Sequence, residues 1–406
     1  SVAGRMKRQP DQEYGLRNYL LVTLGYWGFT LTDGAIRMLV VLYFHQLGYS
    51  PLSIAMLFLF YEFFGVVTNL LGGWIGARIG LNRTMQIGMG MQVVALSMLA
   101  VPAAWLSVPY VMGVQALSGI AKDLNKMSAK ASVKLMLPKE GGNARLFKWV
   151  SLLTGSKNTL KGAGFFLGAL LLSLVGFQVA LLLLAGLLSL TLLMIWLLLP
   201  RGLGRSQSKP KFSQLFSRTE AINWLSAARF FLFGSRDIWF VVALPLFLVS
   251  NLGWEHQQVG GFIALWVVGY GVVQSMVPLL LRRFNVQPGG ETTQRVALLL
   301  ALVPLAIAWG LSAGWDASLV VIVGLAVFGG IFALNSALHS YLILAYSDRD
   351  QVVTNVGFYY MANAGGRLLG TLLSGWIYQL QGLEGCLWWS AGMVLVAALF
   401  SLRLPR

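Results

Sequence analysis

Long apolar stretches separated by short polar segments run along almost the whole chain. A helix needs about 20 mostly apolar residues to cross a bilayer. Twelve stretches fit this length, and they cover approximately residues 19–44, 51–76, 85–105, 109–136, 149–175, 179–199, 220–250, 257–281, 296–313, 318–346, 353–380 and 385–403. The clearest is 179–199, which contains no charged residue. The pattern predicts an all-α polytopic membrane protein with twelve transmembrane helices.

The one long polar connection divides these stretches into two groups of six. Short matches recur in both groups: Leu-Gly-Tyr-Ser at 47–50 corresponds to Leu-Gly-Trp-Glu at 252–255, and Gly-Val-Val occurs at 65–67 and 271–273. Two related halves are typical of transporters that bind substrate between them near the membrane midplane; chance matching in a Gly- and Leu-rich sequence is the alternative. We predict an N-terminal cytoplasmic segment, an N-terminal six-helix bundle, a cytoplasmic central loop and a C-terminal six-helix bundle at 1–18, 19–199, 200–219 and 220–406.

Basic residues outside the apolar stretches all fall on one side of the predicted membrane. Twenty Lys and Arg residues belong to the two ends of the chain, the central loop and the other loops on that side. The loops on the opposite side contain none; they lie near 45–50, 106–108, 176–178, 251–256, 314–317 and 381–384. Because positively charged loops face the cytoplasm, both termini are predicted to be cytoplasmic.

Composition excludes several classes of protein. Hydrophobic residues make up 57% of the chain and charged residues 11%, against roughly 45–50% and about 25% in soluble domains. The formal charge of +16 would suggest nucleic acid in a soluble protein, but membrane orientation accounts for most of it, so lipid is the expected surrounding and nucleic acid is not a partner. One cysteine, Cys386, and three scattered histidines predict neither a metal site nor a cofactor.

The predicted spans carry ten basic residues and only four acidic ones. Each charge at the centre of a span costs about 2.5–3.5 kcal/mol on insertion scales, so most of these side chains should face a wet cavity, an acid or an anionic ligand. The basic residues are Arg37, Lys122, Lys126, Lys130, Lys134, Lys157, Lys161, Arg229, Arg236 and Arg367, and the acidic ones are Asp33, Glu62, Asp123 and Asp237.

Helical spacing places several of these charges on single faces. Asp33 and Arg37 are four residues apart, as are Lys122 and Lys126, and residues at this spacing share a helix face. Instead of lining a cavity, Asp33 and Arg37 could form a structural ion pair with each other. Lys130 and Lys134 continue the lysine row, but long basic side chains also extend to lipid headgroups near helix ends.

Four of the ten basic residues are hardest to explain structurally: Lys122, Lys161, Arg236 and Arg367 come from four helices, and all lie near mid-span. Asp237 is the direct neighbour of Arg236, but adjacent positions on a helix point apart, so we expect different partners for the two. Convergent Arg and Lys without matching acids suit a multiply charged oxyanion.

The predicted ligand is therefore a polyanion bound from both halves. Its negative charges would be held by basic residues, and its other polar atoms would be hydrogen-bonded by polar ones; the binding residues are Lys122, Lys126, Lys157 and Lys161, then Arg37, Arg229, Arg236 and Arg367, then Asn158, Asn335, Tyr359 and Asn363. The four acids, Asp33, Glu62, Asp123 and Asp237, are predicted to balance charge in the empty site or to carry a coupling proton.

Two sets of motifs resemble known families. The run GWIGARIGLNR at 73–83 resembles the loop signature that follows the second helix in the major facilitator superfamily, with Ala77 where that signature has Asp. The runs WGFTLTDGAIR at 27–37, FLFYEFFG at 58–65, SGIAKDLNKMSAK at 118–130 and LTGSKNTLKG at 153–162 resemble the bacterial ArsJ-type organoarsenical efflux permeases.

The resemblance implies a function, a partner and a location. It implies alternating access and export of 1-arseno-3-phosphoglycerate, which forms when glyceraldehyde-3-phosphate dehydrogenase uses arsenate in place of phosphate. It therefore implies functional pairing with that enzyme, arsenate resistance and a bacterial inner membrane. An organophosphate:phosphate exchanger of the same fold is the alternative, with one arginine from each half, such as Arg37 and Arg236. An intramembrane enzyme is not expected, because His339, the one histidine inside a predicted span, has no acidic partner on its own helix.

Overall fold

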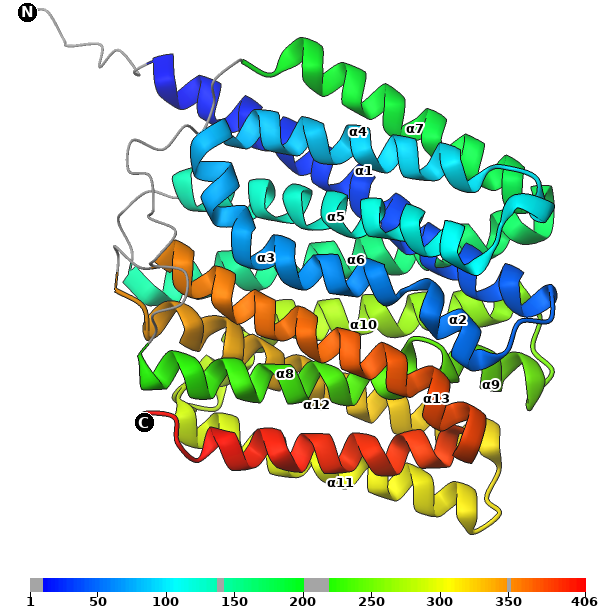
Figure 1. The fold of residues 1–406 in the computed structure, drawn as a ribbon. Helices are drawn as coiled ribbons and strands as arrows, with labels where there is room; N and C mark the ends of the chain where they lie inside the picture. The colour runs from blue at the N-terminus through cyan, green and yellow to red at the C-terminus, as the bar shows by residue number, and fades with distance from the viewer. Residues whose placement is uncertain (1–9, 137–141, 201–218, 349–351) are drawn as a thin grey trace, which may run out of the picture.

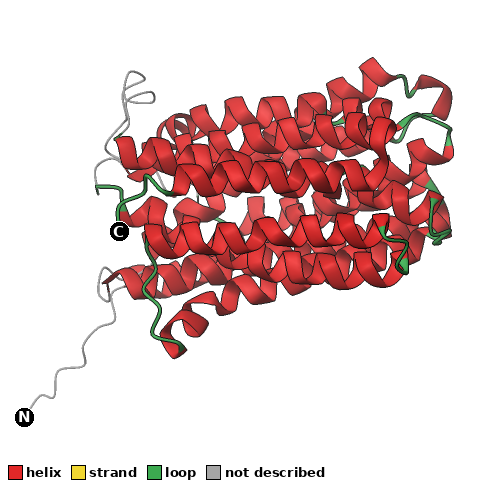
Figure 2. Cartoon of the chain, turned by 90° about the horizontal axis from the view of Figure 1, so that it is seen from below, coloured by secondary structure: helices red, strands yellow, loops and turns green. Residues whose placement is uncertain are grey.

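The computed structural model describes residues 10–136, 142–200, 219–348 and 352–406. Every regular element in these ranges is helical (Figure 2). The elements are α1 (Pro10–Gln46), α2 (Pro51–Leu57), α3 (Leu59–Ile79), α4 (Leu81–Leu99), the 3₁₀ turn η1 (Ala103–Trp105), α5 (Val108–Met136), α6 (Gly142–Val175), α7 (Phe177–Leu198), α8 (Glu220–Phe240), α9 (Ala243–Ser250), α10 (His256–Arg283), α11 (Gly290–Ser312), α12 (Ala317–Ala345) and α13 (Val352–Ser401). The all-α prediction is confirmed for this part of the chain.

The described elements make up twelve long helices. Helix α2 continues into α3 through Phe58, and α8 is followed directly by α9. Helix α13 is two helices that meet at Gly382, whose φ of 71° lies in the left-handed region that favours glycine. Figure 1 shows the chain reversing its direction at that end of α13. Eight helical stretches of the described residues are apolar and long enough to cross a membrane, and the more polar α1, α4 and α5 supply the remaining helices.

The two sequence matches at 47–50 and 252–255 form the same kind of turn. Gly48 and Gly253 have φ values of 89° and 69°, which are conformations that glycine adopts without a Cβ penalty. Two residues later, Ser50 accepts a hydrogen bond from the backbone N–H of Ser53, and Glu255 forms a capping box with Gln258. Such caps satisfy the free N–H groups at a helix start, so both matches end one helix and begin the next.

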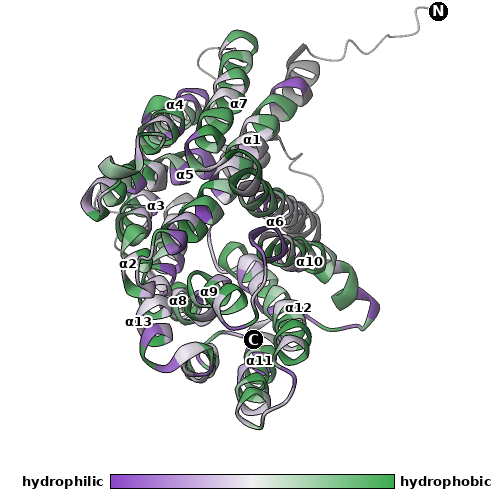
Figure 3. Ribbon diagram, turned by 90° about the vertical axis from the view of Figure 1, so that its right-hand side faces the viewer, coloured by the Kyte–Doolittle hydropathy of each residue, from purple (hydrophilic) through white to green (hydrophobic). Residues whose placement is uncertain are grey.

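The helices lie side by side between two ends of the molecule (Figure 1). The end at which α1 begins and the chain finishes is called the termini end. The helices α1–α7 form one side of the bundle and α8–α13 the other; we call them the first and second sets. The two sets meet mainly where α6 packs along α10 and where α2 and α3 pack along α13. Seen end on, apolar residues cover much of the outside of the bundle (Figure 3).

Glycines bring the helices of the two sets close together. A Cβ atom at Gly162 on α6 would lie 2.7 Å from the backbone oxygen of Ala264 on α10, and one at Gly271 would lie 2.7 Å from that of Gly155. Small residues allow such close backbone approach in membrane proteins, where van der Waals packing drives helix association. The glycines of both helices therefore allow the close packing of α6 against α10.

Within the second set, Gly366 fixes the crossing of α13 and α8. A methyl group there would collide with the backbone carbonyl of Phe230, whereas Gly392, which is exposed later in α13, has open space around its Cα. We expect Gly366→Ala to destabilise the protein by about 1–3 kcal/mol through overpacking, and Gly392→Ala to be neutral or slightly stabilising because alanine favours helix. Thermal unfolding of the two purified variants in detergent measures this difference, and equal melting temperatures would contradict it.

Several helices differ at one end by six residues or more from the predicted apolar spans. Helix α4 covers 81–99 rather than 85–105, because Pro102 cannot continue the helix and the chain enters η1. Helix α11 begins at Gly290 rather than near 296, because its polar first turn packs against the end of the chain at Leu404 and Pro405. Helices α1 and α6 begin at Pro10 and Gly142, well before the apolar stretch that hydropathy detects.

Some predictions lie outside the described residues. They concern most of the N-terminal segment 1–18 and the central loop 200–219, and the side chains of Lys130, Lys134 and Ala77 also belong to this group.

Candidate functional site

A polar cavity lies inside the bundle where both sets of helices meet. It offers about 60 Å³ to the centre of a water-sized sphere, where a single water needs about 10–15 Å³. We call it the central cavity, and its lining residues are Tyr26, Arg37, Lys126, Lys157, Asn158, Lys161, Phe165, Arg229, Phe233, Arg236, Phe240, Trp266, Val267, Tyr270, Ser340, Tyr360, Asn363 and Arg367. Seven of them are basic, and no described acidic residue lines it.

A smaller side cavity adjoins the central one on the side of α1 and α5. The two share Tyr26, Lys126, Lys157, Lys161 and Arg367, and the side cavity adds Phe29, Thr30, Asp33 and Lys122. Asp33 is the one described acidic residue among its lining. The four lysines Lys122, Lys126, Lys157 and Lys161, which we call the lysine cluster, therefore come together from α5 and α6.

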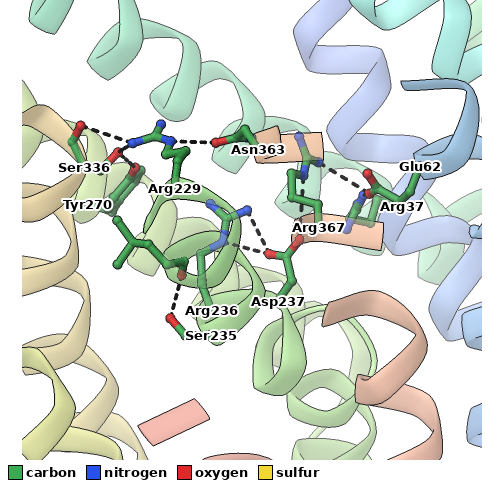
Figure 4. A network of polar contacts seen from close by, with 11 residues as sticks. Arg37, Glu62, Arg229, Ser235, Arg236, Asp237, Tyr270, Ser336, Asn363 and Arg367 are labelled. Carbon is green, nitrogen blue, oxygen red and sulfur yellow. Dashed lines mark hydrogen bonds and ion pairs between the residues drawn. The ribbon is translucent and has the colours of Figure 1, made fainter. Parts of the chain in front are cut away.

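The arginines are arranged differently from the lysines, because carboxylates link three of them into one chain of ion pairs (Figure 4). Arg37 Nη2 on α1 lies 3.1 Å from Glu62 Oε1 on α3, and the same oxygen lies 3.6 Å from Arg367 Nη2 on α13. Arg367 Nε lies 3.6 Å from Asp237 Oδ2 on α8, whose other oxygen lies 2.8 Å from Arg236 Nη2. Charges alternate along this ion-pair chain, and its Glu62–Arg367 contact joins the two sets of helices.

The ion-pair chain corrects three expectations from the sequence. Arg37, Arg236 and Arg367 do have matching acids. Arg37 pairs with Glu62 and not with Asp33, which accepts a hydrogen bond of 2.7 Å from the hydroxyl of Tyr61. Arg236 and Asp237 do not point apart, because the arginine is long enough to fold back and donate from Nε to its neighbour at 2.8 Å.

Arg229 is held by neutral partners on the second set of helices. Its Nε donates to Asn363 Oδ1 at 2.7 Å, and its Nη1 donates to the hydroxyl of Ser336 at 3.0 Å and to the carbonyl oxygen of Ser336 at 3.2 Å (Figure 4). The guanidinium also lies over the ring of Phe233 at 3.9 Å, an arrangement that orients arginine without cancelling its charge. Arg229 therefore presents a fixed positive charge to the central cavity.

Aromatic rings fix other cations of the site in the same way. Lys122 Nζ lies 4.4 Å from the centre of the Tyr61 ring, and Lys126 Nζ lies 4.0 Å from that of Tyr360 on α13. Lys122 and Lys161 form no ion pair with any residue that the structure describes. Lys122 and Lys161 thus carry positive charge that no described carboxylate neutralises by direct contact.

The remaining predicted residues divide between the cavities and the surrounding packing. Asn158 and Asn363 line the central cavity. Asn335 and Tyr359 are buried and line neither cavity; Tyr359 packs under the guanidinium of Arg229 at 5.0 Å. Asp123 is also fully buried and faces α3, where its Oδ2 would lie 3.0 Å from a Cβ atom on Gly65.

The structure adds residues that the sequence did not single out. Tyr61 contacts Asp33 and Lys122, and Phe233 supports both Arg229 and Arg236. Tyr61 directly precedes Glu62, but nothing in an aromatic-rich span distinguishes it from a packing residue. No group of three or more side chains that could hold a metal ion occurs among the described residues. The arrangement is suited to binding an anion electrostatically.

Comparisons with known proteins agree on the architecture. A family model described as the Major Facilitator Superfamily matches residues 22–290. The human organic anion transporter MFSD10 (TETRAN) is 18% identical, with a TM-score of 0.70 over 97% of this chain and 100% of that one. A POT family transporter in complex with 5-aminolevulinic acid is 14% identical, with a TM-score of 0.74 over 95% of both chains.

A bacterial homologue of the iron transporter ferroportin, in an outward-facing state, is 15% identical, with a TM-score of 0.68 over 96% of this chain and 98% of that one. A search of curated protein sequences gives no match. At these identities the solved structures establish the fold of the chain and not its substrate.

Proposed function

The chain belongs to the major facilitator superfamily and is a multi-pass membrane transporter, and from that premise we propose that it carries a small organic anion with two oxyanion groups. The observation that carries the proposal is the lining of the central cavity, which has seven basic side chains and no acidic one among the described residues. Such a lining repels a cation, and a neutral substrate would leave its charge unbalanced, whereas phosphate-like groups bind both guanidinium and ammonium groups.

The charge of the site supports a substrate with several negative charges. Eight basic and four acidic side chains are gathered in and around the two cavities, which leaves a formal surplus of four positive charges. A phosphate monoester carries about 1.5–2 negative charges at neutral pH, and an arsenate ester is a close chemical analogue. One molecule with both groups would therefore come close to neutralising the surplus.

The arrangement of the cations supports binding at two ends. Lys122 on α5 and Lys161 on α6, which form no ion pair with a described residue, lie on the first set of helices, and Arg229 and Arg236 lie on the second set, at α8. We propose that the lysine cluster binds one oxyanion and the α8 arginines bind the other, with Asn158 and Asn363 donating to the body of the ligand. A ligand bridging the two sets would reduce the repulsion between them and favour closure.

Contacts between the sets on either side of the cavity support alternating access. At the end opposite the termini, the Leu52 backbone N–H donates to Gln379 Oε1 at 3.3 Å, and Ser250 Oγ lies 3.4 Å from His45 Nε2. Toward the termini end, α3 and α13 pack closely, because a Cβ atom at Gly357 would lie 3.2 Å from the backbone oxygen of Asn69. In our proposal these two groups of contacts break in turn. In our proposal the termini end faces the cytoplasm, because positively charged loops face that side, and the membrane is a bacterial inner membrane, as the sequence resemblance implies.

The specific substrate that we propose is 1-arseno-3-phosphoglycerate, and the direction is export. This rests on the resemblance of four sequence runs to the ArsJ-type permeases, two of which contain the whole lysine cluster. The proposal includes functional pairing with glyceraldehyde-3-phosphate dehydrogenase and a contribution to arsenate resistance.

Everted membrane vesicles containing the full-length protein test this function. We expect arsenic to accumulate inside them only when glyceraldehyde-3-phosphate dehydrogenase, glyceraldehyde 3-phosphate, NAD and arsenate are all present, because only then is the ester made. Vesicles without the protein and reactions without the sugar phosphate are the controls. Accumulation from arsenate alone, or equal accumulation without the protein, would contradict the proposal.

An organophosphate:phosphate exchanger is the second candidate. The observation that favours it is that Arg37 and Arg236, from different sets, both line the central cavity and end the same ion-pair chain. Loading vesicles with inorganic phosphate distinguishes the two functions. Exchange predicts that internal phosphate accelerates uptake of 3-phosphoglycerate severalfold, whereas export of the arsenate ester predicts no such acceleration.

A further inference from the structure

The four acids predicted to balance the site have different surroundings. Glu62 lies between Arg37 and Arg367, and Asp237 lies between Arg236 and Arg367. Asp123 is buried against α3 and lines neither cavity. Asp33 alone among these four lines a cavity, and it shares that cavity with all members of the lysine cluster.

The carboxylate of Asp33 is also held in a defined position. Its Oδ1 accepts a hydrogen bond of 2.7 Å from the hydroxyl of Tyr61, whose ring lies under the ammonium group of Lys122. Tyr61 is itself fixed, because its backbone packs directly against Gly119 where α3 crosses α5. The hydroxyl therefore keeps one oxygen of Asp33 directed at Tyr61 and limits its approach to the lysines.

We infer that Asp33 is a built-in competitor for the anionic end of the substrate, and that Tyr61 restrains it. This inference rests on the proposed function and explains what sets the affinity of the site for its substrate. In the empty transporter the carboxylate partly balances the lysine cluster; an incoming phosphate or arsenate group takes over the lysines, and the same carboxylate repels it. Asp33 thereby limits affinity, which an exporter needs in order to release its substrate on the far side.

The inference predicts opposite effects for two neighbouring substitutions. Asp33→Asn keeps the size and hydrogen-bonding shape of the side chain but removes its charge, so the full-length protein in detergent should bind 3-phosphoglycerate at least about fivefold more tightly. Its turnover in vesicles should fall, because release becomes slower. Tyr61→Phe keeps the ring under Lys122 but frees Asp33 to approach the lysines, so binding should weaken about two- to fivefold.

The double variant separates this assignment from a merely structural role. If Tyr61 acts through the charge of Asp33, Asp33→Asn/Tyr61→Phe should bind as tightly as Asp33→Asn alone, whereas two structural defects would add and weaken binding. Calorimetry with 3-phosphoglycerate and with inorganic phosphate gives the dissociation constants.

Each outcome of that calorimetry has a meaning. Equal or weaker binding by a folded Asp33→Asn variant, beside clear binding by the wild type, would overturn the inference and leave the proposed function standing. If Asp33→Asn does not fold, Tyr61→Phe decides alone: weaker binding supports the inference, and equal or tighter binding overturns it. A wild-type protein that binds neither anion would overturn both the proposed function and this inference.

Discussion

Replacing Glu62 with glutamine should destabilise the transporter more than any other single neutral substitution in the ion-pair chain. Glu62 is fully buried and shares one carboxylate oxygen between Arg37 and Arg367. Without the charge, Arg37 has no carboxylate within ion-pair distance among the described residues, and its guanidinium lies 5.2 and 5.5 Å from the rings of Phe58 and Tyr61. Removing one partner of a buried ion pair costs about 3–5 kcal/mol, because the other charge remains buried without compensation. The purified variant should melt on the order of 5–10 °C below the wild type.

The exposed ion pair on α11 provides a matched control for that measurement. Arg295 Nη2 lies 2.6 Å from Glu291 Oε1, with exposed side-chain fractions of 73% and 51%. A pair of this kind contributes about 0–1 kcal/mol, so Glu291→Gln should leave the melting temperature close to that of the wild type. The double variant Glu62→Gln/Arg37→Gln should recover part of the lost stability, because it removes the uncompensated charge as well. Equal melting temperatures for Glu62→Gln and Glu291→Gln would show that the ion-pair chain does not stabilise the fold.

The sequence predicted which basic residues converge but not how the arginines are neutralised. Helical periodicity alone places Lys122 with Lys126, and Lys157 with Lys161, on single faces. Packing between helices decides the partner of a carboxylate, however, and Glu62 meets Arg367 only because α3 and α13 pack together. No spacing rule within one helix contains that information. The Arg236–Asp237 contact was missed for a different reason: a spacing rule based on Cβ directions ignores the length of an arginine side chain.

The same difference between local and non-local information explains which parts of the fold could be predicted from the sequence. The glycines at 48 and 253 and the caps that follow them are local signals, and both turns form as their matched sequences suggest. The start of α11 depends on the end of the chain, which packs against Gly290, so hydropathy could not place it. Tyr61 likewise acquires its contacts only when α3 crosses α1 and α5. Residues with strong local patterns were therefore predictable, and residues defined by helix crossings were not.

The second large effect concerns Lys161, which should be more important for binding than any surface cation. Lys161 lines both cavities and forms no ion pair with a described residue. Its backbone carbonyl packs directly against the Cα of Gly34 on α1, so the position of the side chain along α6 is fixed. A hydrogen bond to a charged group contributes about 1.5–3 kcal/mol. Lys161→Ala should therefore weaken binding of 3-phosphoglycerate about 10- to 100-fold, as measured by calorimetry.

Two further variants separate the effect of direct contact between Lys161 and the ligand from the effect of the net charge of the protein. Lys161→Arg keeps the charge and the reach of the side chain, so affinity should stay within about fivefold of the wild type. Arg295→Ala removes the same charge from the exposed surface of α11, where screening by salt is strong, so affinity should remain within about twofold. If Lys161→Ala and Arg295→Ala weakened binding equally, the effect would come from net charge and not from the site.

The stability of Lys161→Ala should change in the opposite direction from its binding. A positive charge inside the membrane that is not paired with a carboxylate costs free energy in the empty protein, and its removal should raise the melting temperature by a few degrees. Residues kept for binding at a cost in stability are common at functional sites. Glu62 and Lys161 thus make a contrasting pair: neutralising the first should destabilise the fold, and neutralising the second should stabilise it while weakening binding. A fall in the melting temperature of Lys161→Ala comparable to that of Glu62→Gln would assign the lysine to packing instead.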